Sequence, residues 1–210
     1  IEKRLIEAFE NYPIYGFKNG VNMNIMISPT EDPDDLFYGK YKSIQITADS
    51  VVSNKVKIKE FELLFENVQI NIYDLLLNGK FILFNLEKLT PRGIINFDDL
   101  EKSAAQAMKG KGKIKLTGGN NSITINAKYG LAQNQILEGN TKINVSIEPG
   151  KTIQPDFEYF KLGPFDIPIV FIRRITNAKI SLNPTPGWPL ETNIKSLKIS
   201  PRKFEINPDI

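Results

Sequence analysis

Apolar and polar residues alternate with a period of two along much of the chain. Ile44, Ile46 and Ala48 are apolar, for example, and polar residues lie between them. Because successive side chains of a strand point to opposite faces, this alternation predicts strands with one apolar face and one wet face, as in antiparallel sheets. The same pattern predicts further strands over residues 21–27, 56–59, 61–65, 114–116, 123–125, 143–147 and 194–199.

The phase of this alternation changes near Glu60. Val56 and Ile58 are apolar before this point, whereas Phe61 and Leu63 are apolar after it. An extra residue in one strand of a pair would produce such a change, so the sequence predicts a β-bulge at Glu60.

Helical patterns interrupt the strands. Residues 1–10 place Ile1, Leu5 and Phe9 four positions apart and predict a short amphipathic helix, which packs on its own domain or lies on a membrane surface. Packing on its own domain is the favoured alternative. Further short helices are predicted over 33–38, closed by Gly39, over 97–109, and over 168–174.

These elements predict a single β-dominated α+β domain that spans residues 1–210. No repeat and no low-complexity linker divides the sequence. We expect a long, curved antiparallel sheet that forms an elongated barrel-like body, with a few helices laid against or inside it. Such a sheet can fill its interior with side chains or leave room for a ligand, and the periodicity alone favours the filled interior.

The 210 residues contain neither cysteine nor histidine. The chain therefore forms no disulfide and no histidine-ligated metal site, and it lacks the commonest general base. Catalysis by carboxylates, lysines or tyrosines is not excluded, but without histidine and cysteine we do not expect an enzyme. We predict a protein with no catalytic residues, no metal and no cofactor.

Three carboxylates lie close together in the sequence at Asp32, Asp34 and Asp35. Such a group can hold Ca²⁺, but its spacing does not match the calcium-binding loop of an EF-hand. Capping of the short helix at Pro33 is therefore the favoured interpretation. The neighbouring pair Asp98 and Asp99 is interpreted in the same way, as helix capping and not as an acid–base pair.

The net charge is +3, and the densest run of lysines is Lys109, Lys111, Lys113 and Lys115. A mild positive charge suits anionic lipid headgroups or an anionic membrane surface, although a solvated face is the favoured interpretation for any single lysine. The charge is low for a dedicated nucleic-acid-binding protein and no recognised module is present, so we predict no nucleic-acid partner.

Three stretches resemble a known family in their order and spacing. They are Leu36 to Asp49 (LFYGKYKSIQITAD), Ile94 to Leu100 (IINFDDL), and Gly187 to Leu190 (GWPL), which precedes the strand at 194–200 and a final strand around Phe204. Together they resemble the LmeA-like phospholipid-binding family of bacteria, a relative of the tubular lipid-binding folds. Trp188 departs from the leucine-like residue that is usual in the family.

The resemblance implies an elongated β-rich fold with a lengthwise apolar cavity, and non-catalytic binding or transport of phospholipid-like ligands in the cell envelope. The implied partners are a phospholipid or another long-chain lipid, and a membrane surface. An extracytoplasmic location, whether periplasmic, cell-envelope or secreted, follows in the same way. The chain starts at Ile1 and shows no signal segment, so we expect a mature or trimmed form.

A structural or protein-interaction module of the envelope with a solid core is the alternative. If the interior holds lipid, its wall consists of large apolar side chains from the strands, the main helix and a mouth near the last third of the chain. These candidates are Ile44, Ile46, Ile58, Phe61, Leu63, Phe65, Phe97, Leu100, Met108, Phe165, Ile169, Phe171 and Trp188. For any one of these side chains, an ordinary core position is the favoured interpretation.

Overall fold

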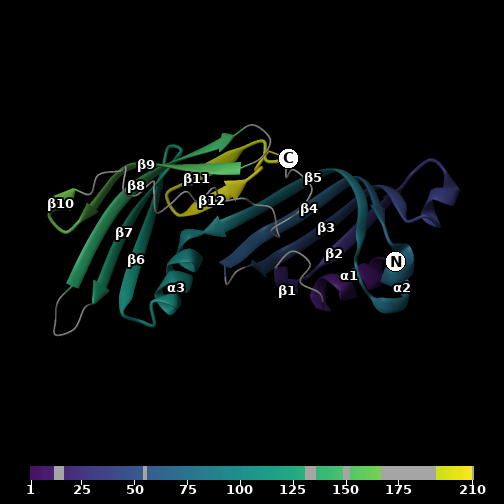
Figure 1. Ribbon diagram of the computed structural model, residues 1–210, viewed down its shortest axis with the longest axis horizontal. Helices are drawn as coiled ribbons and strands as arrows, with labels where there is room; N and C mark the ends of the chain where they lie inside the picture. The colour runs from purple at the N-terminus through teal and green to yellow at the C-terminus, as the bar shows by residue number, and fades with distance from the viewer. Residues whose placement is uncertain (12–16, 54–55, 131–135, 149–151, 167–192, 210) are drawn as a thin grey trace. The chain divides into compact units, whose positions relative to one another are not determined.

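The computed structural model describes residues 1–11, 17–53, 56–130, 136–148, 152–166 and 193–209 (Figure 1). They form two compact units. Unit 1 contains residues 1–94 with 193–194, and unit 2 contains residues 95–166 with 195–209. The prediction of a single domain over 1–210 stays a prediction.

Unit 1 is an antiparallel sheet with helices. Its strands are β1 (Phe17–Val21), β2 (Asn24–Pro29), β3 (Lys40–Ser53), β4 (Val56–Ile70) and β5 (Leu83–Asn96), the last of which continues into unit 2. The order is β1-β3-β4-β5, and β2 also pairs with β3. Its helices are α1 (Glu2–Asn11), the 3-10 turn η1 (Pro33–Leu36) and α2 (Ile72–Asn78).

Unit 2 contains an antiparallel five-stranded sheet in the order β10-β9-β8-β7-β6. These strands are β6 (Gly112–Gly119), β7 (Ser122–Gly130), β8 (Ile136–Glu148), β9 (Thr152–Leu162) and β10 (Phe165–Asp166). Helix α3 (Phe97–Ala107) and the hairpin of β11 (Leu197–Ser200) with β12 (Lys203–Ile206) complete the unit.

These elements confirm a β-dominated fold with antiparallel sheets and few helices. The barrel-like body is not confirmed, because the described strands do not close into a barrel. The predicted helices over 1–10, 33–38 and 97–109 are confirmed by α1, η1 and α3. The predicted helix over 168–174 lies outside the described residues.

The interior of unit 1 is filled by its own helices. Leu5 and Ala8 of α1 and Leu75 of α2 are fully buried, and they belong to one cluster with the apolar side chains of β3 and β4. Helix α1 thus packs on its own unit, as the favoured interpretation of its sequence predicted. A continuous apolar core of this kind stabilises the unit mainly by removing methyl and methylene groups from water.

The predicted β-bulge at Glu60 is wrong, although the change of phase is real. Ser50 pairs with Lys59 and Ala48 pairs with Phe61, so the register of β3 and β4 does not shift across Glu60. Ala48 and Val51 of β3 are both buried although they are three residues apart, so the alternation of buried side chains also changes phase in β3. The two paired strands therefore change phase at the same place. At this change of phase, Glu60 adopts a positive φ of 47°.

The strand predicted over 21–27 is two strands. Asn22 adopts a φ of 52°, which ends β1 at Val21, and β2 begins at Asn24. Asparagine is among the few residues other than glycine that tolerate this left-handed conformation. The Asn22 side chain also donates to Asp49 (2.6 Å), which holds the break against β3.

Helix α2 was not predicted from the sequence. Asn71 caps it by accepting from the Asp74 N–H (3.1 Å), and Gly79 ends it in the left-handed conformation with φ 63°. These are ordinary start and stop signals of a helix. They are easy to overlook because the segment IYDLLLN has apolar residues all round and no helical period.

Two leucines of α2 give a matched test of this core. Leu75 is fully buried, whereas Leu77 is 80% exposed two residues later. We expect Leu75→Ala to lower the free energy of unfolding by about 2–5 kcal/mol and Leu77→Ala to change it by less than about 0.5 kcal/mol. Urea unfolding followed by circular dichroism measures both. Equal losses would show that α2 does not cover the sheet as described.

Candidate functional site

The five-stranded sheet of unit 2 has one apolar face. The register pairs Leu116 with Ile125, and Ile125 with Thr141, which in turn faces Phe160. Directly paired residues point to the same side of a sheet, so the apolar side chains of four strands form rows across it. We define the apolar face by Ile114, Leu116, Ile123, Ile125, Ile143, Phe157, Phe160 and Leu162.

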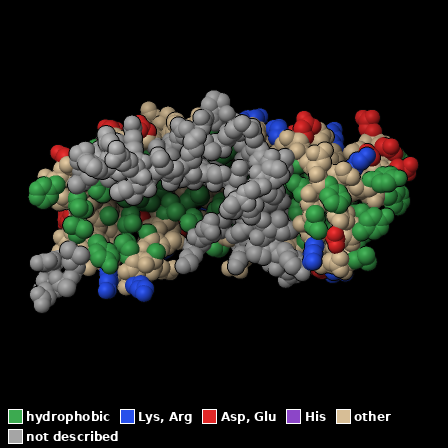
Figure 2. Space-filling model, in the orientation of Figure 1, with side chains coloured by type: hydrophobic (Ala, Val, Ile, Leu, Met, Phe, Trp, Pro, Cys, Tyr) green, Lys and Arg blue, Asp and Glu red, His purple; other side chains and the backbone are tan. Residues whose placement is uncertain are grey.

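The apolar face is incompletely buried. Leu116 is 8% exposed, and the other seven side chains of the face are half-buried. Figure 2 shows hydrophobic side chains gathered over β6–β9. By contrast, Ile44, Ile46 and Phe65 on the inner face of the unit 1 sheet are fully buried. The unit 2 sheet therefore retains apolar surface that a ligand can remove from water.

The opposite face of this sheet is polar. Lys115, Asn126, Asn140 and Lys161 form one row across it, and they include part of the lining of a shallow surface groove. Four of its charges form two ion pairs within the face: Lys128 with Glu138 (2.6 Å) and Lys142 with Glu158 (2.6 Å). The two faces thus have distinct chemistry, and only one suits an acyl chain.

Helix α3 covers the free edge of β6. The backbone N–H of Leu116 points away from β7 and donates to Glu101 Oε1 (2.8 Å). Arg202 lies 3.8 Å from the same carboxylate and also pairs with Asp98. Met108 lies over Gly112, where a side chain would meet its sulfur at 2.3 Å. These contacts hold α3 along the edge of β6.

The structure brings the predicted strand residues together in unit 1. Ile44, Ile46, Phe61, Leu63 and Phe65 are buried in a single cluster, and the partly buried Ile58 packs against it. The same cluster contains side chains of α1 and α2, so these strand residues share one core with the unit's own helices. Their contact with lipid stays a prediction.

The remaining predicted residues are in other places. In α3 and at its end, Phe97 is fully buried, while Leu100 and Met108 are half-buried. Phe165 is 69% exposed on the edge strand β10, where it pairs with Leu162 of the apolar face. Ile169, Phe171 and Trp188 lie outside the described residues.

The sequence did not reveal the contribution of β9 to the apolar face. Tyr159 pairs with Lys142, but Phe157 pairs with Ile143, so Glu158 is an extra residue in β9. This bulge puts Phe157 and Phe160 on one face although they are three residues apart. A strict period of two cannot put both phenylalanines on one face. The spacing of three residues between them, close to Pro155, is the signal in the sequence that indicates a bulge.

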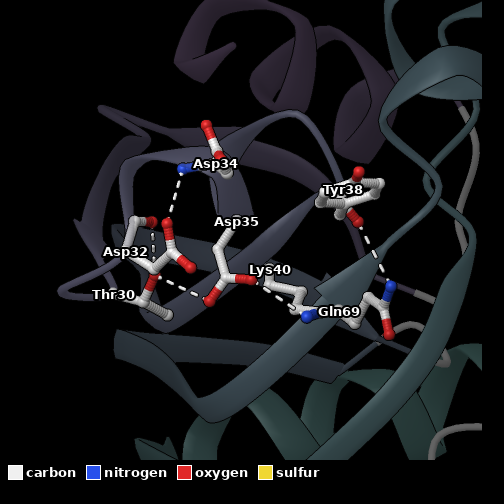
Figure 3. Close-up of polar contacts among 7 residues, drawn as sticks. All are labelled: Thr30, Asp32, Asp34, Asp35, Tyr38, Lys40 and Gln69. Carbon is white, nitrogen blue, oxygen red and sulfur yellow. Dashed lines mark hydrogen bonds and ion pairs between the residues drawn. The ribbon is translucent and has the colours of Figure 1, made fainter.

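The carboxylates near Pro33 cap and brace a turn, as Figure 3 shows. Asp32 accepts from the Asp34 N–H (2.9 Å), and Asp35 accepts from Lys40 (2.9 Å) and from the Thr30 hydroxyl (3.1 Å). This confirms capping as the function of Asp32. Over the part of the chain that the structure describes, no group of acidic residues is arranged to hold a metal ion.

The sequence of the chain identifies its protein family. The sequence matches the family model described as LmeA-like phospholipid-binding over residues 35–203. The chain belongs to this LmeA-like phospholipid-binding family. No curated protein and no solved structure matches the chain. None of the helices within the described ranges has the length and apolar character needed to cross a membrane.

The contact between Glu101 and β6 gives a second test. We expect Glu101→Ala to lower the free energy of unfolding by about 1–3 kcal/mol, because the Leu116 N–H loses its acceptor in a largely buried place. Glu101→Gln keeps an acceptor oxygen and is expected to cost less. Amide hydrogen exchange of Leu116 should accelerate in the alanine variant alone. Unchanged exchange in both variants would contradict this role.

Proposed function

We propose that this protein binds phospholipid-like molecules on the apolar face of unit 2, without catalysis, and carries or holds them in the bacterial cell envelope. The observation that carries the proposal is a half-buried apolar face in a chain of the LmeA-like phospholipid-binding family. Each methylene of an acyl chain that leaves water on such a face contributes about 0.8 kcal/mol. A long-chain lipid therefore matches the chemistry of this surface.

The lipid headgroup lies at the rim of the face in this proposal. Strand β6 is an edge strand, and it alternates apolar-face residues with Lys113 and Lys115, which are exposed on the polar side of this edge. Lysine side chains can reach along a sheet edge while their methylene stems cover apolar surface. They can thus meet a phosphate oxygen without any need for a metal ion or a catalytic base.

A structural or interaction module of the envelope is the second candidate function. It is favoured by the filled core of unit 1, in which Leu5 and Leu75 belong to one cluster with the strand residues that the sequence suggested as a lipid wall. Unit 1 would then be a rigid support. The two functions differ in one observable, because only the first requires bound lipid.

Native mass spectrometry with solvent extraction of the purified protein tests the proposal. We expect a stoichiometric phospholipid in the wild type. Ile125→Glu places a charge on the apolar face and should reduce bound lipid at least about tenfold, because an unpaired carboxylate is costly beside an acyl chain. Thr124→Glu is the matched control, since the neighbouring residue points to the polar face.

A wild type that carries no lipid, and takes up none from added vesicles, would contradict lipid binding and favour the structural module. Equal loss of lipid in both variants would place the ligand elsewhere. The extracytoplasmic location belongs to the same proposal. Fractionation of cells that produce the full-length protein tests it.

A further inference from the structure

One end of unit 1 carries an unusual set of exposed apolar side chains. Phe37 is 73% exposed, Tyr38 65%, Tyr73 71% and Leu77 80%. Figure 2 shows hydrophobic side chains at the end of unit 1 where α2 and the connection from β2 to β3 lie in Figure 1. We define the tip cluster as Leu36, Phe37, Tyr38, Tyr73, Leu76 and Leu77.

The two parts of the tip cluster are neighbours in space. Gly39 lies against α2, because a side chain at this position would meet Ile70 O at 2.2 Å and the Cβ of Ile72 at 3.4 Å. The Gln69 side chain donates to Tyr38 O (3.2 Å), and the Ile70 N–H donates to Gly39 O (2.9 Å). The turn that carries Phe37 is thus attached to the start of α2.

Helix α2 is apolar on both of its faces. Ile72 and Leu75 are buried in the core, whereas Tyr73, Leu76 and Leu77 are exposed on the other side. A helix with apolar residues all round is normally buried on all sides. The outer face of α2 therefore has the character of a surface that leaves water when the protein binds a partner.

The turn that presents Phe37 and Tyr38 is braced. Asp35 accepts from Lys40 and from Thr30, and Lys40 Nζ lies 5.8 Å from the centroid of the Tyr38 ring (Figure 3). The hydrogen bond from Lys40 lowers the pKa of Asp35 below its ordinary value. These contacts brace the turn from which Phe37 and Tyr38 project, and both side chains are largely exposed there.

We propose that the tip cluster docks on the surface of a zwitterionic phospholipid bilayer. Tyrosine and phenylalanine side chains enter the boundary between headgroups and acyl chains, and leucine contributes further apolar area. The proposal rests on the proposed lipid function, because a protein that takes up phospholipid must meet the bilayer that supplies it. It identifies which surface makes that contact.

The charges around the tip select the kind of bilayer. Lys40 is paired with Asp35, and the carboxylates of Glu31, Asp32 and Asp34 are exposed beside the turn. An anionic bilayer would repel these groups, whereas the outer ammonium groups of zwitterionic lipids complement them. A second copy of the chain fits less well, because a symmetric contact would bring like charges together.

Flotation with phosphatidylcholine vesicles tests this docking. The double variant Phe37→Ser/Tyr38→Ser should lower the vesicle-bound fraction about tenfold or more, because both rings lose their apolar contact. Ile136→Ser on β8 is the control, since Ile136 is also exposed, at 64%, but belongs to unit 2. Its binding should equal that of the wild type. Addition of anionic lipid should weaken wild-type binding, and high salt should restore it.

Three results would overturn the docking proposal. They are a wild type that does not float, a double variant that floats like the wild type, and a wild-type dimer that the double variant converts to a monomer. The last result would assign the tip to a second copy of the chain, and analytical ultracentrifugation detects it. Thermal unfolding of the variants checks that these exposed substitutions leave the fold unchanged.

Uptake of a short-chain phosphatidylcholine below its micelle concentration separates docking from lipid binding, because it involves no bilayer. The double variant should take up this lipid like the wild type, yet acquire long-chain lipid from vesicles more slowly. If neither protein takes up the short-chain lipid, the proposed lipid function fails while docking is still judged by flotation. If both take it up and neither floats, docking alone fails.

Discussion

The apolar face of an antiparallel sheet has to be removed from water, and this requirement governs both units of the protein. In unit 1, α1 and α2 meet it, so that Ile44 and Phe65 of the sheet are fully buried. In unit 2, α3 covers the edge of β6 and leaves the side chains of β7, β8 and β9 half-buried. The same physical demand therefore produces a filled core in one unit and a candidate ligand surface in the other.

This difference gives the family assignment a structural meaning. A phospholipid offers long apolar chains and a small polar head, and the unit 2 sheet offers an apolar face and, on the polar side of its β6 edge, two exposed lysines. The tip cluster of unit 1 adds a second apolar surface, with tyrosines and a braced turn, whose character suits contact with a bilayer and not enclosure of one molecule.

Much of the fold could be predicted from the sequence because local patterns determine it. The alternation in β3 and β4, the capping residues at Pro33, and the amphipathic spacing of α1 and α3 each carry a direct signal. The candidate site could be predicted less well, since its rows depend on pairing between distant strands and on an extra residue at Glu158. Helix α2 was not predicted, because apolar residues lie on both of its faces and give no helical period. The change of phase at Glu60 was misinterpreted as a bulge, because β3 changes phase at the paired position. The pattern of one strand alone cannot show that its partner changes in the same way.

The most direct test of the central claim is photocrosslinking with a phospholipid that carries a diazirine in its acyl chain, followed by mass spectrometry of the labelled peptides. We expect labels on residues 112–162, concentrated at Ile125, Ile143 and Phe160 of the apolar face. Labels confined to the buried residues of β3 and β4, or no labels above those of a lipid-free control protein, would contradict it.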